Sequence, residues 1–101
     1  MPHRLDIDLD ELASVCRRYG IRELFVFGSA LRADFSQASD IDLLVEYEPG
    51  VWLGFLQYFA LKEEFEQLFG RPVDLVEGRS RLTNPYRRKA ILESMERVYA
   101  A

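Results

Sequence analysis

Two aspartates at the start of an apolar segment place the strongest constraint on how this chain folds. The segment Ser39–Val45 reads S-D-I-D-L-L-V, which is typical of a buried strand. Side chains on a strand alternate between its faces, so Asp40 and Asp42 point to the same side. Neighbouring carboxylates repel each other and lose solvation, and folding alone gives no reason to place them there. A divalent metal ion with oxygen ligands would remove the conflict, and a triphosphate would be its natural companion.

A third aspartate, Asp74, lies inside the apolar segment Val73–Val76, which reads as a short strand. If this strand lies beside Ile41–Tyr47, the three carboxylates converge on one site. Taken alone, Asp74 is equally well explained as a strand-end residue that hydrogen-bonds a nearby turn. The Asp-x-Asp spacing is itself common, and Asp6–Asp10 repeats it at an expected helix start, where capping explains it.

The turn Gly28-Ser29 follows the apolar run Leu24–Phe27 and has the features of a phosphate-binding turn. Glycine lets the backbone approach a ligand closely, and the N–H groups at a helix start favour anions. Ser29 adds a hydroxyl donor, and Arg32 can form charge-assisted bonds to phosphate oxygens. A Gly-Ser pair also occurs in many ordinary loops, so this turn gains weight only beside the aspartates.

Length and composition indicate one small globular domain over residues 1–101. Apolar residues make up 49% and aromatic residues 13% of the chain, which suits a single core. No apolar run approaches a membrane span and the start has no signal-peptide pattern, which predicts a cytoplasmic protein. Cys16 is the single cysteine, in agreement with a reducing compartment, and the single histidine, His3, excludes a zinc site of the usual Cys/His kind.

The charge pattern excludes one class of function and indicates one candidate surface. A net charge of −4 argues against bulk binding of nucleic acid. The basic region 79–89 is free of acids and contains Arg79, Arg81, Arg87, Arg88 and Lys89. Each of these residues taken singly is explained as solvated surface, whereas the group is a candidate for contacting phosphate or an acidic partner. The acidic region 63–66 likewise predicts a solvated helix face.

Hydrophobic spacing and helix-end signals predict an α/β domain with the element order α-β-β-α-β-α. A first helix has Asp8 as N-cap, carries Cys16 on its buried stripe and ends at Gly20. The remaining elements are expected as strands over 24–27, 41–47 and 73–76 and as helices over 53–69 and 84–97. We therefore expect a small mixed β-sheet flanked by helices.

Taken together, these motifs resemble the DNA polymerase beta-like nucleotidyltransferase superfamily. The shared pattern is Gly28-Ser29-x-x-Arg32, then Ser39-Asp40-x-Asp42-Leu43, then Asp74 on a later strand. The small size and the helical end expected at Arg87–Tyr99 are similar to its minimal branch, the MNT or MntA-like proteins. The resemblance covers Ile21–Tyr99 and implies the nucleotidyltransferase fold.

Membership of this family implies a nucleoside triphosphate, usually ATP, two Mg²⁺ ions and transfer of a nucleotidyl group to a hydroxyl. By position, Asp40 and Asp42 would hold the metals, and Asp74 would complete the site near the acceptor. The turn Gly28-Ser29 would hold the triphosphate, with Arg32 assisting. The hydroxyl would attack the α-phosphate in line and release pyrophosphate. Asp74 would either bind the acceptor-side metal or accept the proton of the hydroxyl.

The same family implies a protein partner. Minimal nucleotidyltransferases commonly pair with a HEPN-domain protein, a toxin-like ribonuclease, act as its antitoxin and attach AMP to one of its tyrosines. This chain has no room for an acceptor domain, and it has more aromatic residues than a small domain buries, Trp52 among them. Two alternatives stay open. One is a binding module with an idle metal site that neutralises a HEPN partner sterically, and the other is a transferase that acts on a small molecule or an RNA end.

Overall fold

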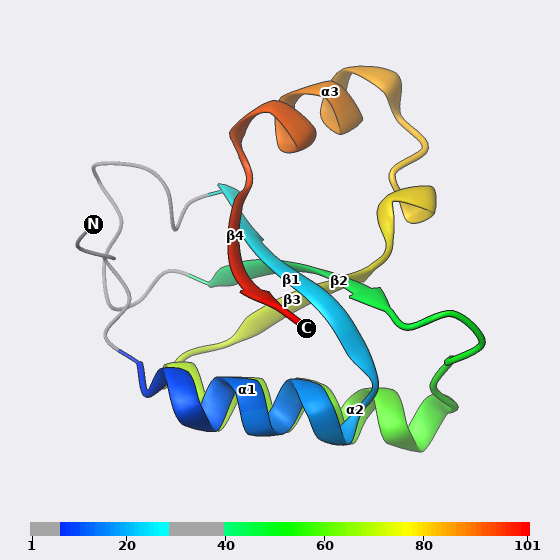
Figure 1. The fold of residues 1–101 in the computed structure, drawn as a ribbon. Coiled ribbons are helices and arrows are strands. Elements are labelled where there is room, and N and C mark those ends of the chain that lie inside the picture. The colour runs from blue at the N-terminus through cyan, green and yellow to red at the C-terminus, as the bar shows by residue number, and fades with distance from the viewer. Residues whose placement is uncertain (1–6, 29–39) are drawn as a thin grey trace.

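The computed structural model describes residues 7–28 and 40–101, which form one mixed sheet with helices on both faces (Figure 1). The strand order is β3-β2-β1-β4, with β2 and β3 parallel and the other two pairs antiparallel. None of the helices in these ranges has the length and hydropathy needed to cross a lipid bilayer. In chain order the elements are α1 (Leu9–Arg18), β1 (Ile21–Phe27), β2 (Ile41–Tyr47), α2 (Phe55–Phe69), β3 (Val73–Glu77), the 3-10 helix η2 (Arg79–Arg81), α3 (Pro85–Ser94) and β4 (Glu96–Ala100).

The first helix begins and ends where the sequence predicts. Asp8 is its N-cap, and the Asp8 carboxylate accepts hydrogen bonds from the backbone N–H groups of Asp10 (2.9 Å) and Glu11 (3.2 Å). Gly20 lies just after the helix with a φ of 70°. Cys16 is fully buried, and this burial raises the pKa of its thiol to about 12. Cys16 is therefore a small core residue, as expected.

The central strands and α2 also lie close to their expected ranges. β2 has the expected bounds, whereas β1 begins at Ile21 instead of Leu24. α2 begins at Phe55 instead of Leu53 and ends at Phe69, as expected, with Gly70 as its C-cap. These differences concern element ends, where propensity and hydrogen bonding compete most closely.

The helix expected over 84–97 is wrong at its last residues, 95–97, and the helical end expected at Arg87–Tyr99 is wrong after Ser94. α3 ends at Ser94, and the chain from Glu96 to Ala100 forms β4, which pairs antiparallel with β1. Met95, between them, has an extended backbone with a φ of −67° and a ψ of 149°. The edge of β1 offers hydrogen-bonding partners to this segment, and its β-branched and aromatic residues suit a strand. The element order is therefore α-β-β-α-β-α-β, and the end over 87–99 is a helix followed by a strand.

The sheet separates two apolar clusters. α1 and α2 cover one face, where Leu24, Leu43 and Phe65 are fully excluded from solvent. On the other face a smaller cluster joins the sheet to Leu82 and to Ile91 of α3. Figure 1 shows this arrangement, with α1 and α2 together below the sheet and α3 above it. The cluster on the α3 face has fewer buried residues than the cluster under α1 and α2.

Side chains of α2 cover the free edge of β3. The backbone N–H of Val73 donates to the Glu66 carboxylate (3.0 Å), and this bond holds the pKa of Glu66 below its usual value. The Tyr58 hydroxyl donates to the Leu75 carbonyl (3.1 Å). These contacts occupy backbone groups that an edge strand otherwise offers to another chain. Part of the acidic region 63–66 therefore supports the fold and is not only solvated surface.

Candidate functional site

Asp42 and Asp74 are direct neighbours across the parallel pair of strands. β2 and β3 are in register with Asp42 opposite Asp74, and Asp42 also lies opposite Phe27 of β1. Neighbouring strands are about 5 Å apart, and residues at facing positions project from the same face of the sheet. Asp42 is half-buried, and Asp74 is exposed. β3 lies beside β2, as expected, and of the three carboxylates expected to converge the register brings together Asp42 and Asp74.

Both carboxylates lie on the sheet face that α3 covers. Leu44 and Val76, two residues further along β2 and β3, pack in the same cluster as Ile91 of α3. Because strand side chains alternate, Asp42 shares the face of Leu44, and Asp74 shares the face of Val76. The pair therefore stands near the N-terminal ends of β2 and β3, beyond the edge of the apolar cluster.

Asp40 directly precedes β2 and is exposed. The backbone N–H of Ile41 donates to the Pro72 carbonyl (2.9 Å), which fixes the start of β2 against the chain that enters β3. Within residues 7–28 and 40–101, no three Asp, Glu, Cys or His side chains are grouped closely enough to hold a metal ion by themselves. The structure thus brings Asp42 and Asp74 together, whereas Asp40 lies two residues before Asp42, which is one repeat along the strand.

Gly28 directly follows β1 and lies against the Asp42 carboxylate. Its φ is 72°, in the left-handed region that glycine adopts without steric cost. A Cβ atom built on Gly28 would overlap Asp42 Oδ2 and would lie 3.0 Å from Asp42 Cγ. The sequence indicated this glycine as a place where a ligand approaches the backbone. The structure shows that the close approach also involves a carboxylate of the site.

We expect Gly28→Ala to lower the free energy of unfolding by about 1–3 kcal/mol, the usual cost of holding a non-glycine residue in a strained backbone conformation. It should also displace the Asp42 carboxylate. Gly50→Ala is the matched control, because Gly50 has a φ of 84° but nothing within 4 Å of a built Cβ. Urea unfolding of both variants separates backbone strain from the clash. Equal losses in the two variants would contradict a specific contact between Gly28 and Asp42.

Two expected site residues, Ser29 and Arg32, lie outside the described residues, as does His3. The described part of the site therefore consists of Gly28, Asp40, Asp42 and Asp74, which come from three strand ends.

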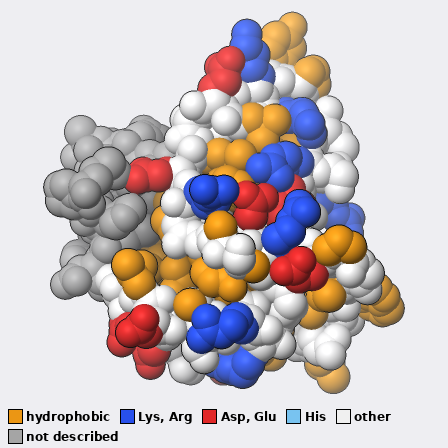
Figure 2. Space-filling view, viewed as in Figure 1, with side chains coloured by type: hydrophobic (Ala, Val, Ile, Leu, Met, Phe, Trp, Pro, Cys, Tyr) orange, Lys and Arg blue, Asp and Glu red, His pale blue; other side chains and the backbone are white. Residues whose placement is uncertain are grey.

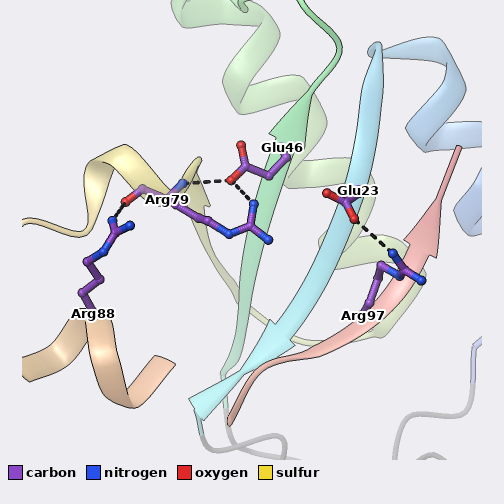
Figure 3. A network of polar contacts seen from close by, with 5 residues as sticks. All are labelled: Glu23, Glu46, Arg79, Arg88 and Arg97. Atoms are coloured by element: carbon purple, nitrogen blue, oxygen red, sulfur yellow. Dashed lines mark hydrogen bonds and ion pairs between the residues drawn. The ribbon is translucent and has the colours of Figure 1, made fainter. Parts of the chain in front are cut away.

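Arg79 and Arg88 of the basic region make contacts inside the molecule (Figure 3). Arg79 Nη1 lies 2.6 Å from Glu46 Oε2, and the Arg79 backbone N–H donates to the same oxygen at 3.1 Å. The Arg79 guanidinium also lies 5.0 Å from the centroid of the Phe25 ring. Arg88 Nη1 donates to the Arg79 carbonyl (2.9 Å), which ties α3 to η2. These two arginines hold η2 and α3 over the sheet.

Sequence reasoning missed a second pair of strand carboxylates on the α3 face. Glu23 and Glu46 lie opposite each other on β1 and β2, and each forms an ion pair with an arginine (Figure 3). Arg97 of β4 pairs with Glu23 at 3.1 Å. The available signal was the alternation of Glu23 with Phe25 along β1, which predicts a shared face.

Positive and negative side chains are mixed on the described part of the face in Figure 2. Lys and Arg side chains lie next to Asp and Glu side chains over the sheet, without one continuous basic surface in this view. A basic patch or stripe is the usual footprint of a nucleic-acid-binding protein.

Comparison with known proteins identifies relatives over most of the chain. Residues 10–98 match the family model described as nucleotidyltransferase domain. A Methanocaldococcus jannaschii protein that is provisionally named a protein adenylyltransferase is 35% identical over 78 residues, which cover 77% of each chain. Protein adenylyltransferase MntA of Thermococcus cleftensis is 44% identical over 59 residues, which cover 58% of each chain.

A solved structure has the same fold. It is a chain from the complex of tri-AMPylated Shewanella oneidensis HEPN toxin with MNT antitoxin. The TM-score is 0.61 at 16% identity, and the match covers 92% of this chain and 70% of that chain. At this identity the likeness concerns the fold alone, and it agrees with the expected mixed sheet flanked by helices.

Proposed function

Because the chain belongs to the nucleotidyltransferase domain family, we propose that it transfers AMP from ATP to a hydroxyl group. The observation that carries the proposal is the register of β2 and β3, which places Asp42 directly beside Asp74 on one sheet face. Gly28, which follows β1, contacts the Asp42 carboxylate, so the end of a third strand lies at the same place. Both relatives are named as protein adenylyltransferases, which favours AMP as the transferred group.

The carboxylates of the site fit Mg²⁺. This ion prefers oxygen ligands and is usually held by one or two carboxylates together with substrate phosphates and water. Asp42 and Asp74, with Asp40 one repeat away, supply carboxylates without forming a closed protein cage within the described residues. In this proposal Asp40 and Asp42 hold two Mg²⁺ ions, and Asp74 completes the site on the acceptor side. The bound ions supply charge neutralisation of the leaving pyrophosphate and activation of the attacking hydroxyl.

The triphosphate is proposed to bind at the turn that follows β1. Gly28 brings the backbone against the Asp42 carboxylate, so phosphate oxygens bound at this turn lie beside the carboxylates. Ser29 donates its hydroxyl, and Arg32 supplies charge-assisted hydrogen bonds to the phosphate oxygens.

The proposed reaction is an in-line displacement at the α-phosphorus of ATP. A bond forms from the acceptor oxygen to this phosphorus, and the bond to the bridging oxygen of pyrophosphate breaks. The hydroxyl proton passes to Asp74, which suits the acceptor side because β3 is the edge strand and Asp74 is exposed. Asp42 is half-buried between its neighbours and suits metal binding. A tyrosine is a favourable acceptor, because a phenol has a pKa of about 10 and loses its proton more readily than an aliphatic hydroxyl.

The proposed acceptor is a tyrosine of a HEPN-domain toxin, for which this chain acts as antitoxin. The solved complex of an AMPylated HEPN toxin with an MNT antitoxin supports this choice of partner. The acceptor hydroxyl then comes from a second protein that docks beside Asp74.

Mg²⁺ and ATP together are expected to raise the melting temperature more than either ligand alone. A ligand that binds only the folded state stabilises it by about 2.7 kcal/mol at 100 times its Kd, which corresponds to roughly 10 °C or more for a domain of this size. Thermal melts with ATP in Mg²⁺ and with ATP in EDTA measure the contribution of the metal. Equal shifts of the melting temperature under the two conditions would contradict a metal ion in the site.

Mass spectrometry of an acceptor protein tests the function itself. The purified chain is incubated with Mg²⁺, ATP and a HEPN-domain protein from the same genome, and the mass of the HEPN protein is recorded. We expect it to gain the mass of AMP on a tyrosine. A complex that forms without any gain in mass, even with excess ATP, would make the chain a steric binding module.

A further inference from the structure

A groove of about 490 Å³ opens beside β3, close to the proposed active site. Its walls come from the first turns of α2, from β3, and from η2 and the start of α3. Its apolar lining includes Leu53, Phe55, Phe59, Leu75 and Leu82. No step of the proposed transfer reaction uses this groove, so its composition needs a separate explanation.

Large apolar side chains on the groove wall and beside it are exposed to solvent. Phe55 is 76% and Phe59 49% exposed, and the neighbouring Trp52 and Leu56 are 78% and 81% exposed. Phe55 and Phe59 pack edge to face with their ring centroids 4.9 Å apart, so the rings already support each other. Exposed aromatic side chains in one region of a small domain indicate a surface that binds another protein.

Two of the three charged side chains that line the groove are basic. Arg81 and Arg87 line it, and neither guanidinium forms an ion pair with another residue of the described ranges. Glu77 is the acidic one, and its carboxylate accepts a hydrogen bond from the Tyr47 hydroxyl (2.7 Å). Arg79 and Arg88 of the same basic region pair within the molecule, so Arg81 and Arg87 stand apart from them. An occupant with carboxylates would complement these two arginines.

The groove lies within reach of the proposed active site. Val76 lines it, and Asp74 is two residues earlier on the same strand and on the same face. Two residues along a strand span about 7 Å, so Asp74 lies about this distance from the groove wall at Val76. A bound segment that extends past Val76 toward the start of β3 therefore comes next to the pair Asp42–Asp74.

We propose that this groove docks an acidic, amphipathic segment of the acceptor protein and so presents its hydroxyl to Asp74. The inference rests on the proposed function for the identity of the acceptor protein, while the groove and its charge stand on their own. Apolar side chains of the segment pack on Phe55 and Phe59, and its carboxylates pair with Arg81 and Arg87. An RNA strand suits the groove less well, because two arginines and a net charge of −4 give little counterion release.

Charge reversal in the groove tests the proposal. The double variant Arg81→Glu/Arg87→Glu is compared with Arg17→Glu/Arg22→Glu, in which two exposed arginines outside the groove are reversed. Thermal melts first establish that both variants fold. With a HEPN-domain protein of the same genome as the probe, we expect the groove variant to raise Kd and KM for the probe by about tenfold or more. The melting shift with Mg²⁺ and ATP and the kcat stay unchanged, and the control variant behaves as wild type.

A compensating change sharpens the test. Reversal of one acidic residue on the probe should restore binding to the groove variant and weaken binding to the wild type. Wild-type Kd and KM in the groove variant would overturn the docking site while AMP transfer itself still stands. Arginine-dependent complex formation without AMP transfer would support the groove and overturn the proposed function.

Three further outcomes would overturn the docking site. The first is loss of the Mg²⁺ and ATP shift in the groove variant, which would make the groove part of the nucleotide site. The second is labelled single-stranded RNA that binds the wild type and is released by the groove variant, with probe binding unchanged. The third is a wild-type dimer in sedimentation that the groove variant converts to a monomer, with probe binding unchanged.

Discussion

Asp42→Asn is expected to abolish AMP transfer, with a loss of more than about 100-fold, while leaving the fold intact. The amide has the shape of the carboxylate, but it lacks the charge that holds a divalent cation. Without metal, the repulsion between Asp42 and Asp74 falls, so the melting temperature should stay the same or rise slightly. Asp40→Asn should behave in the same way. Activity assays with Mg²⁺ and melts in EDTA measure the two effects.

Glu46→Gln is the matched control for Asp42→Asn. Glu46 is another carboxylate of β2 on the α3 face, but it is satisfied by the Arg79 guanidinium and the Arg79 backbone N–H. Its amide variant should lose stability, by about 1 kcal/mol, and keep its activity. Loss of activity alone in Asp42→Asn and loss of stability alone in Glu46→Gln would distinguish a carboxylate that binds a ligand from one that supports the fold. An Asp42→Asn variant that stays active near the wild-type rate would contradict the metal site.

Asp74→Asn is expected to separate binding of the partner from its modification. Asp74 stands on the edge strand, where we propose that the acceptor hydroxyl binds, so its loss should lower transfer by more than about 100-fold. The partner should still bind with the same Kd, because the carboxylate is not part of the apolar groove that docks it. Calorimetric binding and mass spectrometry of the partner, done on the same variant, test both halves.

The variant also decides between enzymatic and steric neutralisation. If modification neutralises the toxin, the Asp74→Asn chain binds the toxin and leaves its ribonuclease activity in place. A variant that binds and neutralises the toxin completely would contradict the enzymatic account. Asp10→Asn serves as a control, since Asp10 is an exposed residue of α1, outside the site.

The parts of the fold that local rules decide could be predicted from the sequence. Asp8 predicts the start of α1, and the apolar pattern after Asp40 predicts β2 with its bounds. β4 could not be predicted in the same way, because only Val98 and Tyr99 of residues 96–100 favour a strand, and the segment directly follows a helix. Its conformation depends on the edge of β1, which exists only once the sheet has formed.

The candidate site could likewise be predicted only in part from the sequence. The spacing of Asp40 and Asp42 predicts their shared face, and the strand around Asp74 predicts its place in the sheet. The register that puts Asp42 opposite Asp74 is a tertiary fact, as is the contact of Gly28 with the Asp42 carboxylate. The sequence also could not show which arginines of the basic region pair within the molecule. Arg79 and Arg81 have the same side chain, and only the fold places Glu46 beside Arg79.

The position of the label in ATP tests the central claim most directly. The wild-type chain and the Asp42→Asn variant are incubated with Mg²⁺ and a HEPN-domain protein, using ATP labelled either on the α-phosphate or on the γ-phosphate. AMP transfer predicts that the α-label becomes bound to the HEPN protein, that the γ-label leaves as pyrophosphate, and that the variant transfers neither. Transfer of the γ-label, or an α-label that appears equally with the variant, would contradict an adenylyltransferase site built on Asp42 and Asp74.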